Sequence, residues 1–260
     1  MLCAITHVPS PQLQHCELTF VESEPISIEK AKEQHKNYCA MLERCGVKVI
    51  VLDENSVLPD SVFVEDPIVV FDEVAVLTSM GVVSRRAESE YMKKVFSQYR
   101  TIERISLPAK IEGGDVLKIG KKIFVGESAR TNQEGIQALK TIIKPFGYEV
   151  FSVKVTGCLH LKTGATALDE KTIFINSAWV DASDFEGFEL IEVPSDEPFG
   201  ANVLKIGDTL CMNEAFPKSI AVVKTLGYKV DSVNISEFVK AEAGLTCMSV
   251  PFICEDISLK

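Results

Sequence analysis

A β-rich pattern recurs five times along this chain of 260 residues, and such a recurrence constrains the fold more than any other feature of the sequence. Each recurrence opens with a short strand of the type GVKVIVL, and these strands lie roughly 40 to 50 residues apart, a spacing typical of repeat architectures. They begin at Gly46, Tyr99, Gly147, Gly187 and Gly227. One repeated structural unit therefore has to account for most of the chain.

Four of these strands are followed by a second strand, a tight turn and a third strand. The residue pairs DE, GK, DE and GD stand where the hairpin turns belong. The fifth opening strand is followed only by residues 244–253, which can supply one strand but not the second strand of a pair. We expect residues 1–8 to supply the missing strand and to close a ring.

Helical stretches separate the units. They cover residues 27–46, 131–147 and 214–227. Ser27 and Asn132 are suited to cap the first two, because their side chains accept hydrogen bonds from free backbone N–H groups. The sequence therefore predicts an α/β fold with five ββαβ blades around a central axis. Because the pieces are too entangled to separate, we expect residues 1–260 to form a single domain.

The charge of the chain excludes one class of partner. A formal net charge of -10 and a pI near 5.0 argue against nucleic acid, whose binding needs a basic surface. No run approaches the roughly 18 to 20 apolar residues that a membrane span requires, and residues 1–20 lack the pattern of a secretory signal. We therefore expect a cytoplasmic protein with a small-molecule partner and no membrane or nucleic-acid contact.

The eight cysteines are interpreted as free thiols, because a disulfide framework is typical of short secreted chains. They are Cys3, Cys16, Cys39, Cys45, Cys158, Cys211, Cys247 and Cys254. None belongs to a C-x-x-C pair, so the spacing gives no support to a structural zinc site.

Alignment of the repeats places unusual polar residues at equivalent strand ends. These are Glu65 and Asp66 in the first unit, Glu112 in the second, His160 in the third and Cys247 in the fifth. Strand ends that point at a common axis would bring them together. Each of these residues could instead have a purely structural role. An isolated cysteine is usually a core residue, and an acidic pair beside glycines often only caps a turn.

The histidine assignment has three competitors. His35 lies in the first helical stretch among lysines and glutamates, which is typical of a solvated position. His15 lies in an N-terminal stretch that we interpret as a mobile flap, and His7 lies in the first strand. The flanking Gly244, Thr246 and Ser249 make the Cys247 segment more polar than a core strand.

Six segments in order carry a family resemblance: FVEDPIVV, SRR, IEGGDVL, ARTNQEG, CLHLKTG and GLTCMSVPF. Together they resemble the guanidino-modifying pentein superfamily, and within it most closely the dimethylarginine dimethylaminohydrolase family. The resemblance implies a pentein, the five-bladed α/β propeller, with its active site at the centre. It also implies a hydrolase that needs neither a metal nor an organic cofactor.

The resemblance assigns the chemistry to three residues. Cys247 would attack the guanidinium carbon and form a covalent thiouronium, and His160 would act as acid and then as base. Glu112 matches the position that orients the histidine and contacts the substrate. Since a free thiol ionises near pH 8.5, a neighbouring cation must favour the thiolate, and the substrate guanidinium can serve.

Further residues match the substrate contacts of the family. Asp66 is the first choice for the guanidinium, because a buried cation needs a fixed carboxylate. Arg85 and Arg130 match the two arginines that would bind the α-carboxylate. Three more positions match further contacts: Leu18 on a lid loop, Asp60, which also fits an ordinary turn, and Glu65.

The residues after His160 bear on the choice of substrate. Arginine deiminases and amidinotransferases usually carry an aspartate two residues after the histidine, whereas this chain has Leu161 and Lys162. Loss of that carboxylate favours a methylated guanidine, with citrulline and dimethylamine or methylamine as products. Two alternatives remain: deimination of arginine or another guanidine, and a non-catalytic pentein of the kind involved in ribosome assembly. The sequence leaves monomer and homodimer open.

Overall fold

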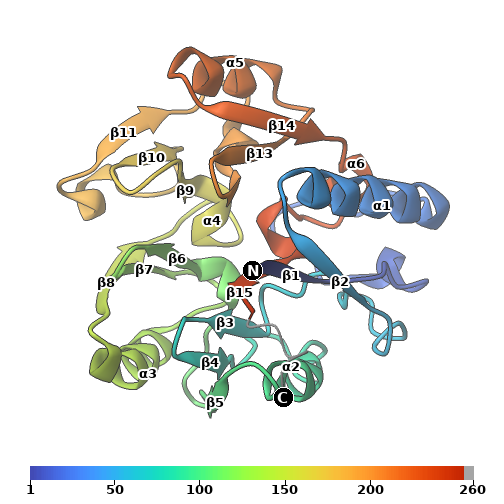
Figure 1. The fold of residues 1–260 in the computed structure, drawn as a ribbon, viewed down its shortest axis with the longest axis vertical. Helices are drawn as coiled ribbons and strands as arrows, with labels where there is room; N and C mark the ends of the chain where they lie inside the picture. Colours follow the sequence, from blue (N-terminus) through green and yellow to red (C-terminus); the bar gives the residue numbers. More distant parts are fainter. Residues whose placement is uncertain (255–260) are drawn as a thin grey trace.

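Five three-stranded sheets surround a central axis in the computed structural model, which describes residues 1–254 (Figure 1). The first sheet is β15 (Val250–Ile253), β1 (Leu2–His7) and β2 (Lys48–Leu52); the second is β3 (Ile68–Val70), β4 (Val74–Leu77) and β5 (Thr101–Arg104). The third is β6 (Val116–Ile119), β7 (Lys122–Glu127) and β8 (Glu149–Lys154). The fourth is β9 (Ala165–Ala167), β10 (Thr172–Ile175) and β11 (Glu189–Glu192); the fifth is β12 (Leu204–Ile206), β13 (Thr209–Asn213) and β14 (Lys229–Val233).

Every sheet has the same internal order, an antiparallel pair followed by a third strand parallel to the second. A parallel neighbour requires a crossover, and helices on the outside of the ring provide most of them (Figure 1). They are α1 (Ile28–Arg44), α2 (Glu88–Phe96), α3 (Gln133–Ile143) and α5 (Pro217–Thr225). The five-bladed ββαβ prediction is confirmed, with one difference. The fourth crossover contains only the 3₁₀ turn η4 (Ala182–Phe185).

Short helical segments complete the chain. They are α4 (Leu161–Gly164), α6 (Ser236–Val239), η1 (Leu13–His15), η2 (Gly113–Asp115), η3 (Lys144–Phe146), η5 (Pro198–Ala201) and η6 (Thr246–Met248). Within residues 1–254, no helix is both long and apolar enough to cross a membrane.

The two ends of the chain close the ring. β1 pairs antiparallel with β15, in a register that joins Leu2 to Ile253 and Ile5 to Val250, as predicted. Cys3 and Cys254, 251 positions apart, form a disulfide beside this pairing, so the prediction of eight free thiols is wrong at these two positions. Ring closure brings their Cα atoms to 6.0 Å, a proximity that composition and spacing do not reveal.

Local signals explain where the helices start and the outer strands begin. The side chain of Ser27 accepts a hydrogen bond from the Lys30 N–H, and that of Asn132 from the Gly135 N–H. Four of the five opening strands follow a glycine with φ between 78° and 90°, a conformation that side chains disfavour. Glycine therefore recurs at these openings because the chain must turn sharply there.

The first helix corrects one histidine assignment. Its buried face contains Ala31, His35, Tyr38, Met41 and Leu42. Only 5% of His35 is exposed, so the expectation of a solvated position is wrong. Burial, with a smaller contribution from His7, lowers the pKa of His35 to about 4. His35 is therefore a neutral core residue.

Candidate active site

Four of the predicted chemical residues each lie a few residues before an edge strand of a different sheet. Asp66 precedes β3, Glu112 precedes β6, His160 precedes β9 and Cys247 precedes β15. These segments meet near the axis of the ring (Figure 1). The repeat thus places one chemical group from each of four blades in the same region.

One cavity at this place is lined by six of the predicted residues: Asp60, Asp66, Arg85, Arg130, His160 and Cys247. Glu112 lies behind His160, whereas Glu65 and Leu18 lie outside the lining. The cavity holds about 20 Å³. That is room for one or two water-sized groups, since each needs roughly 10–15 Å³. An amino acid is larger than this space, so the cavity has to widen when such a molecule binds.

His160 is held between carboxylates. Its Nε2 atom lies 2.8 Å from Oε2 of Glu112, and its Nδ1 atom lies 4.0 Å from Oδ1 of Asp66. Burial lowers the pKa of His160, but Asp66 and Asp115 outweigh this effect. With the hydrogen bond to Glu112, they raise the pKa to about 9. At neutral pH His160 is therefore protonated and can act as an acid.

Two glycines of the IEGGDVL segment allow close packing at the site, one against His160 and one against the backbone of Glu65. A Cβ atom on Gly114 would lie 2.5 Å from Nδ1 of His160, and one on Gly113 would lie 2.0 Å from the carbonyl oxygen of Glu65. Only a hydrogen fits at either position. The glycine pair is thus a packing requirement of the site.

Arg85 neutralises a buried cluster of carboxylates. Its Nη1 donates to Asp66 at 2.7 Å, and its Nε and Nη2 donate to Glu88 at 3.1 and 2.8 Å. Nη2 also donates to the carbonyl oxygen of Phe63 at 3.2 Å. Burial raises the pKa of Asp66, yet His160 and Arg85 reverse this and hold it at about 2. Since four of the five guanidinium N–H groups are used, Arg85 has one left for a ligand.

Fewer of the guanidinium donors of Arg130 are engaged in hydrogen bonds. Its Nη1 lies 3.5 Å from Oε2 of Glu112, and its Nη2 donates to the hydroxyl of Thr19 at 2.9 Å. Most of its donors remain available to a ligand carboxylate.

Cys247 lies on η6 in an environment that disfavours the thiolate. Burial raises the pKa of its thiol to about 12, and the negative charges of Glu65 and Asp66 act in the same direction. The backbone N–H of Gly244 and the positive charge of Lys162, which forms an ion pair with Glu65, oppose the effect. Glu65 also accepts a hydrogen bond from Thr246 at 3.0 Å. Without a bound cation, Cys247 is a neutral thiol.

Residues 17–20 border the cavity, whose lining includes Glu17, and are held by two carboxylates. The Glu17 N–H donates to Asp60, with both oxygens at 3.3 Å. Glu242 accepts the N–H groups of Thr19 and Phe20 at 2.7 and 3.0 Å. Among residues 1–254, Glu242 is the only non-glycine residue with positive φ, at 59°. Such a conformation costs free energy, so the surrounding contacts must fix it.

Three residues of the site escaped the sequence analysis. Glu88 pairs with Arg85, Glu242 holds residues 19 and 20, and Asn202 occupies the equivalent strand end of the remaining blade. Asn202 donates to the Lys162 carbonyl at 2.8 Å and to the Thr246 hydroxyl at 3.1 Å. Completing the alignment of the repeats would have found Asn202, whereas no local signal marks the other two.

Oxygen and nitrogen atoms of Asp66, Glu112 and His160 lie within 4.8 Å of one another, a spacing that a metal ion can bridge. A protonated imidazole, however, has no lone pair for a metal. A metal ion would therefore have to displace the proton of His160 to bind there.

Comparisons with known proteins place the chain in a family. A family model described as N,N dimethylarginine dimethylhydrolase, eukaryotic, matches residues 12–210. The chain is 35% identical over 225 residues to the N(G),N(G)-dimethylarginine dimethylaminohydrolase of Pseudomonas aeruginosa, covering 86% of this chain and 89% of that one. It is 37% identical over 250 residues to the protein of the same name from Streptomyces coelicolor, covering 95% of each.

A solved structure is also similar. The Pseudomonas aeruginosa enzyme, as a cysteine-to-serine variant complexed with citrulline, gives a TM-score of 0.91 at 32% identity. The match covers 96% of this chain and 98% of that chain.

Proposed function

The chain belongs to the dimethylarginine dimethylaminohydrolase family, and we propose that it hydrolyses an N-methylated arginine to citrulline and dimethylamine or methylamine. One observation carries this proposal. A neutral thiol at Cys247, a protonated His160 and the carboxylate of Asp66 line one cavity. A cationic substrate would complete this set of charges.

Substrate binding is the step that creates the nucleophile. The guanidinium of the substrate lies against Asp66 and beside Cys247, where its positive charge lowers the pKa of the thiol. Because His160 already holds its proton, the thiol proton leaves to solvent as the cation binds. His160 then keeps its own proton for the leaving group.

The thiolate attacks the guanidinium carbon and forms a tetrahedral adduct. His160 gives its proton to the methylated nitrogen, the carbon–nitrogen bond breaks, and the amine leaves a thiouronium on Cys247. Neutral His160 next takes a proton from water, whose oxygen adds to the same carbon. The carbon–sulfur bond then breaks, the hydroxyl proton leaves to solvent, and citrulline and the thiolate are released. Glu112 stabilises the imidazole whenever it is charged, before amine release and after water attack.

Different groups hold the amino-acid end. Arg130 binds the α-carboxylate, because most of its donors are available. Arg85 supplies at most one further hydrogen bond and mainly fixes Asp66. Asp60 and Leu18 act through residues 17–20, and Glu65 acts on the electrostatics of Cys247.

One assay tests the function. Purified protein is incubated separately with dimethylarginine, monomethylarginine, arginine and agmatine, and the ureido product of each is measured. The methylated arginines should be consumed with the highest kcat/KM. A preference for arginine would show a deiminase instead, and no product from any guanidine would support a non-catalytic pentein.

We further propose that the protein acts in the cytoplasm as a monomer or homodimer, on a small molecule and not on nucleic acid. The six unpaired cysteines of residues 1–254 favour a reducing compartment, although the Cys3–Cys254 disulfide does not. Light scattering on purified protein would distinguish the two assemblies.

A further inference from the structure

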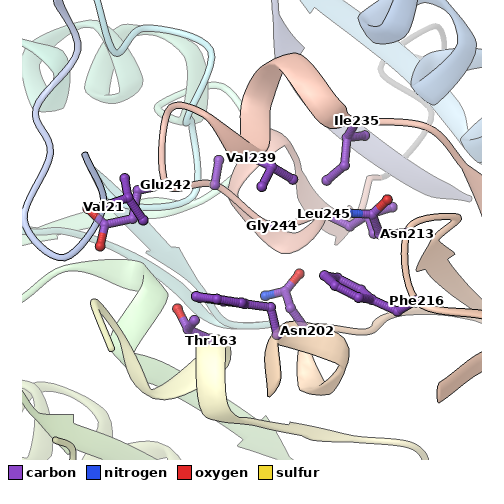
Figure 2. A pocket seen from close by; sticks show the side chains of 12 residues that line it. Val21, Thr163, Asn202, Asn213, Phe216, Ile235, Val239, Glu242, Gly244 and Leu245 are labelled. Atoms are coloured by element: carbon purple, nitrogen blue, oxygen red, sulfur yellow. The ribbon is translucent and has the colours of Figure 1, made fainter. Parts of the chain in front are cut away.

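A second hollow lies next to the active-site cavity and is larger. It holds about 80 Å³, compared with about 20 Å³ for the cavity that contains Cys247. Figure 2 shows its lining, which comes from segments far apart in the chain. They are Val21, Thr163, Phe199, Asn202, Asn213, Phe216, Ile235, Val239, Glu242, Ala243, Gly244 and Leu245. The volume is enough for about five to eight water-sized groups, at roughly 10–15 Å³ each.

The walls of the hollow are mostly apolar, with Ile235, Val239 and Leu245 on one side and Phe199 and Phe216 among the others. The one charged residue of the lining, Glu242, uses both carboxylate oxygens to hold backbone N–H groups. An ionic occupant would therefore lose hydration without gaining a partner. The chemistry of the walls favours an uncharged molecule with an apolar body.

The side-chain amide of Asn213 offers a hydrogen-bond donor that no contact in the described part of the chain uses. Asn213 is 4% exposed, and its Oδ1 accepts the Ala215 N–H at 3.0 Å. Among the hydrogen bonds within residues 1–254, none involves the Nδ2 of Asn213. In Figure 2 this amide lies at the end of the hollow that Ile235 and Leu245 also line. Because this N–H has no acceptor among these residues, a ligand oxygen in the hollow can accept a hydrogen bond from it.

The wall between the two spaces is shared. Glu242 and Ala243 line both the hollow and the active-site cavity, and Cys247 follows a few residues later. Because the active-site cavity is too small for an amino acid, its walls must give way when a substrate enters. An occupant of the hollow would support residues 242–245 from behind and oppose that movement.

We propose that this hollow is a second binding site, for a compact uncharged molecule with an apolar body and one carbonyl oxygen. The carbonyl accepts a hydrogen bond from Asn213, and the body packs against Val239 and Leu245. Occupancy raises the KM of the substrate by stiffening residues 242–245. This last effect rests on the proposed function, whereas binding itself does not.

The first experiment measures binding alone. Cyclopentanone, with six non-hydrogen atoms and one carbonyl, is titrated into methyl-labelled enzyme while the methyl resonances of Val239 and Leu245 are followed by NMR. We expect saturable shifts, and cyclopentane, which lacks the oxygen, should bind more weakly. Shifts that rise linearly without saturation, or that are equal for both compounds, would overturn the site.

Two variants locate the binding. Val239→Phe places a larger side chain in the hollow and should abolish the shifts at Leu245. Val239 is 40% exposed, so the larger ring has room to be accommodated without disturbing the core. Asn213→Leu should weaken binding by about threefold to tenfold, the equivalent of one hydrogen bond. Val51→Phe, on a 49% exposed valine of β2 outside both spaces, is the matched control and should bind like the wild type. Unchanged binding by Val239→Phe would place the ketone elsewhere.

Turnover of monomethylarginine tests the coupling. Saturating cyclopentanone should raise KM by about fivefold, the lower end of ordinary coupling between two sites. Val239→Phe should have a raised KM without ketone and no further response to it. An unchanged KM in the saturated wild type would overturn the coupling and leave the binding result intact. If untreated wild type consumed no methylated arginine, the proposed function would fail, and the NMR titration would still decide the site.

Discussion

The two walls of the active-site cavity are built in opposite ways. On one side Asp66, Arg85, Glu88, Glu112 and His160 are buried and joined by ion pairs and hydrogen bonds. On the other side lies Cys247, whose thiol pKa is raised by burial and by the charge of Glu65, and an apolar hollow borders its segment.

The difference separates two tasks. Fixed charges on the first wall are arranged before the substrate arrives and need no rearrangement during the reaction. The second wall keeps its nucleophile uncharged until a cation binds, because burial holds the thiol pKa at about 12. A thiol of this kind is protected from other electrophiles when no substrate is present.

Replacing the nucleophile should have the largest effect. Cys247→Ser should lower kcat by about a thousandfold or more, because a hydroxyl ionises far less readily than a thiol. Citrulline formation measures the loss, and circular dichroism should show an unchanged fold. In the wild type, acid quench should trap a mass increase on the peptide that contains Cys247. Substantial activity in the serine variant would contradict the nucleophile assignment.

Substitutions in the charged wall should instead lower the stability of the fold. Arg85→Ala leaves Asp66 and Glu88 buried without their cation and should lower the free energy of unfolding by about 3–5 kcal/mol. Arg130→Ala should cost less stability but raise the KM of substrates with an α-carboxylate, leaving agmatine unaffected. Urea unfolding and steady-state kinetics measure the two effects. Equal stability losses would show that both arginines are structural.

The pH dependence of stability should reveal the charge on His160. Its folded pKa of about 9 lies above the ordinary value of 6.5, so its proton stabilises the fold fully below pH 6.5. This contribution is lost as pH rises through about 9, and it amounts to no more than about 3 kcal/mol. The difference in unfolding free energy between wild type and His160→Gln should shrink over that range. Glu112→Gln should weaken the dependence, and a difference independent of pH would mean that His160 is neutral.

The smallest effect concerns the pair beside the thiol. Lys162→Met leaves Glu65 uncompensated near Cys247, so the thiol pKa should rise and kcat/KM at pH 7 should fall by up to about tenfold. The double variant Lys162→Met with Glu65→Gln should recover most of the loss, because both charges are then absent. If the double variant is as slow as the single one, Lys162 acts on the substrate and not on the thiol.

The sequence predicted the main features of this molecule because they are repeated. Five opening strands, four turn pairs and a lone last strand were enough to expect a closed ring, and the β1–β15 register confirms the closure. Cys247, His160 and Glu112 were found because they lie at matching strand ends and match family motifs. Their catalytic roles stay predictions that the variants above test.

Other features depended on contacts that no motif carries. The disulfide between Cys3 and Cys254 and the burial of His35 both arise from packing between distant segments. Glu88 and Glu242 look like ordinary acidic residues, although one supports Arg85 and the other holds residues 19 and 20. Their roles become visible only once the neighbours are known.

By itself, then, the sequence determined the repeat, the strand ends and the type of chemical group at each of them, because local pattern and backbone preference set these. Tertiary structure decided the ionisation of those groups. A thiol pKa of about 12 at Cys247 and an imidazole pKa of about 9 at His160 result from burial and from carboxylates brought in by other blades. Desolvation and Coulomb interactions depend on distances through space, and distance along the chain does not report them.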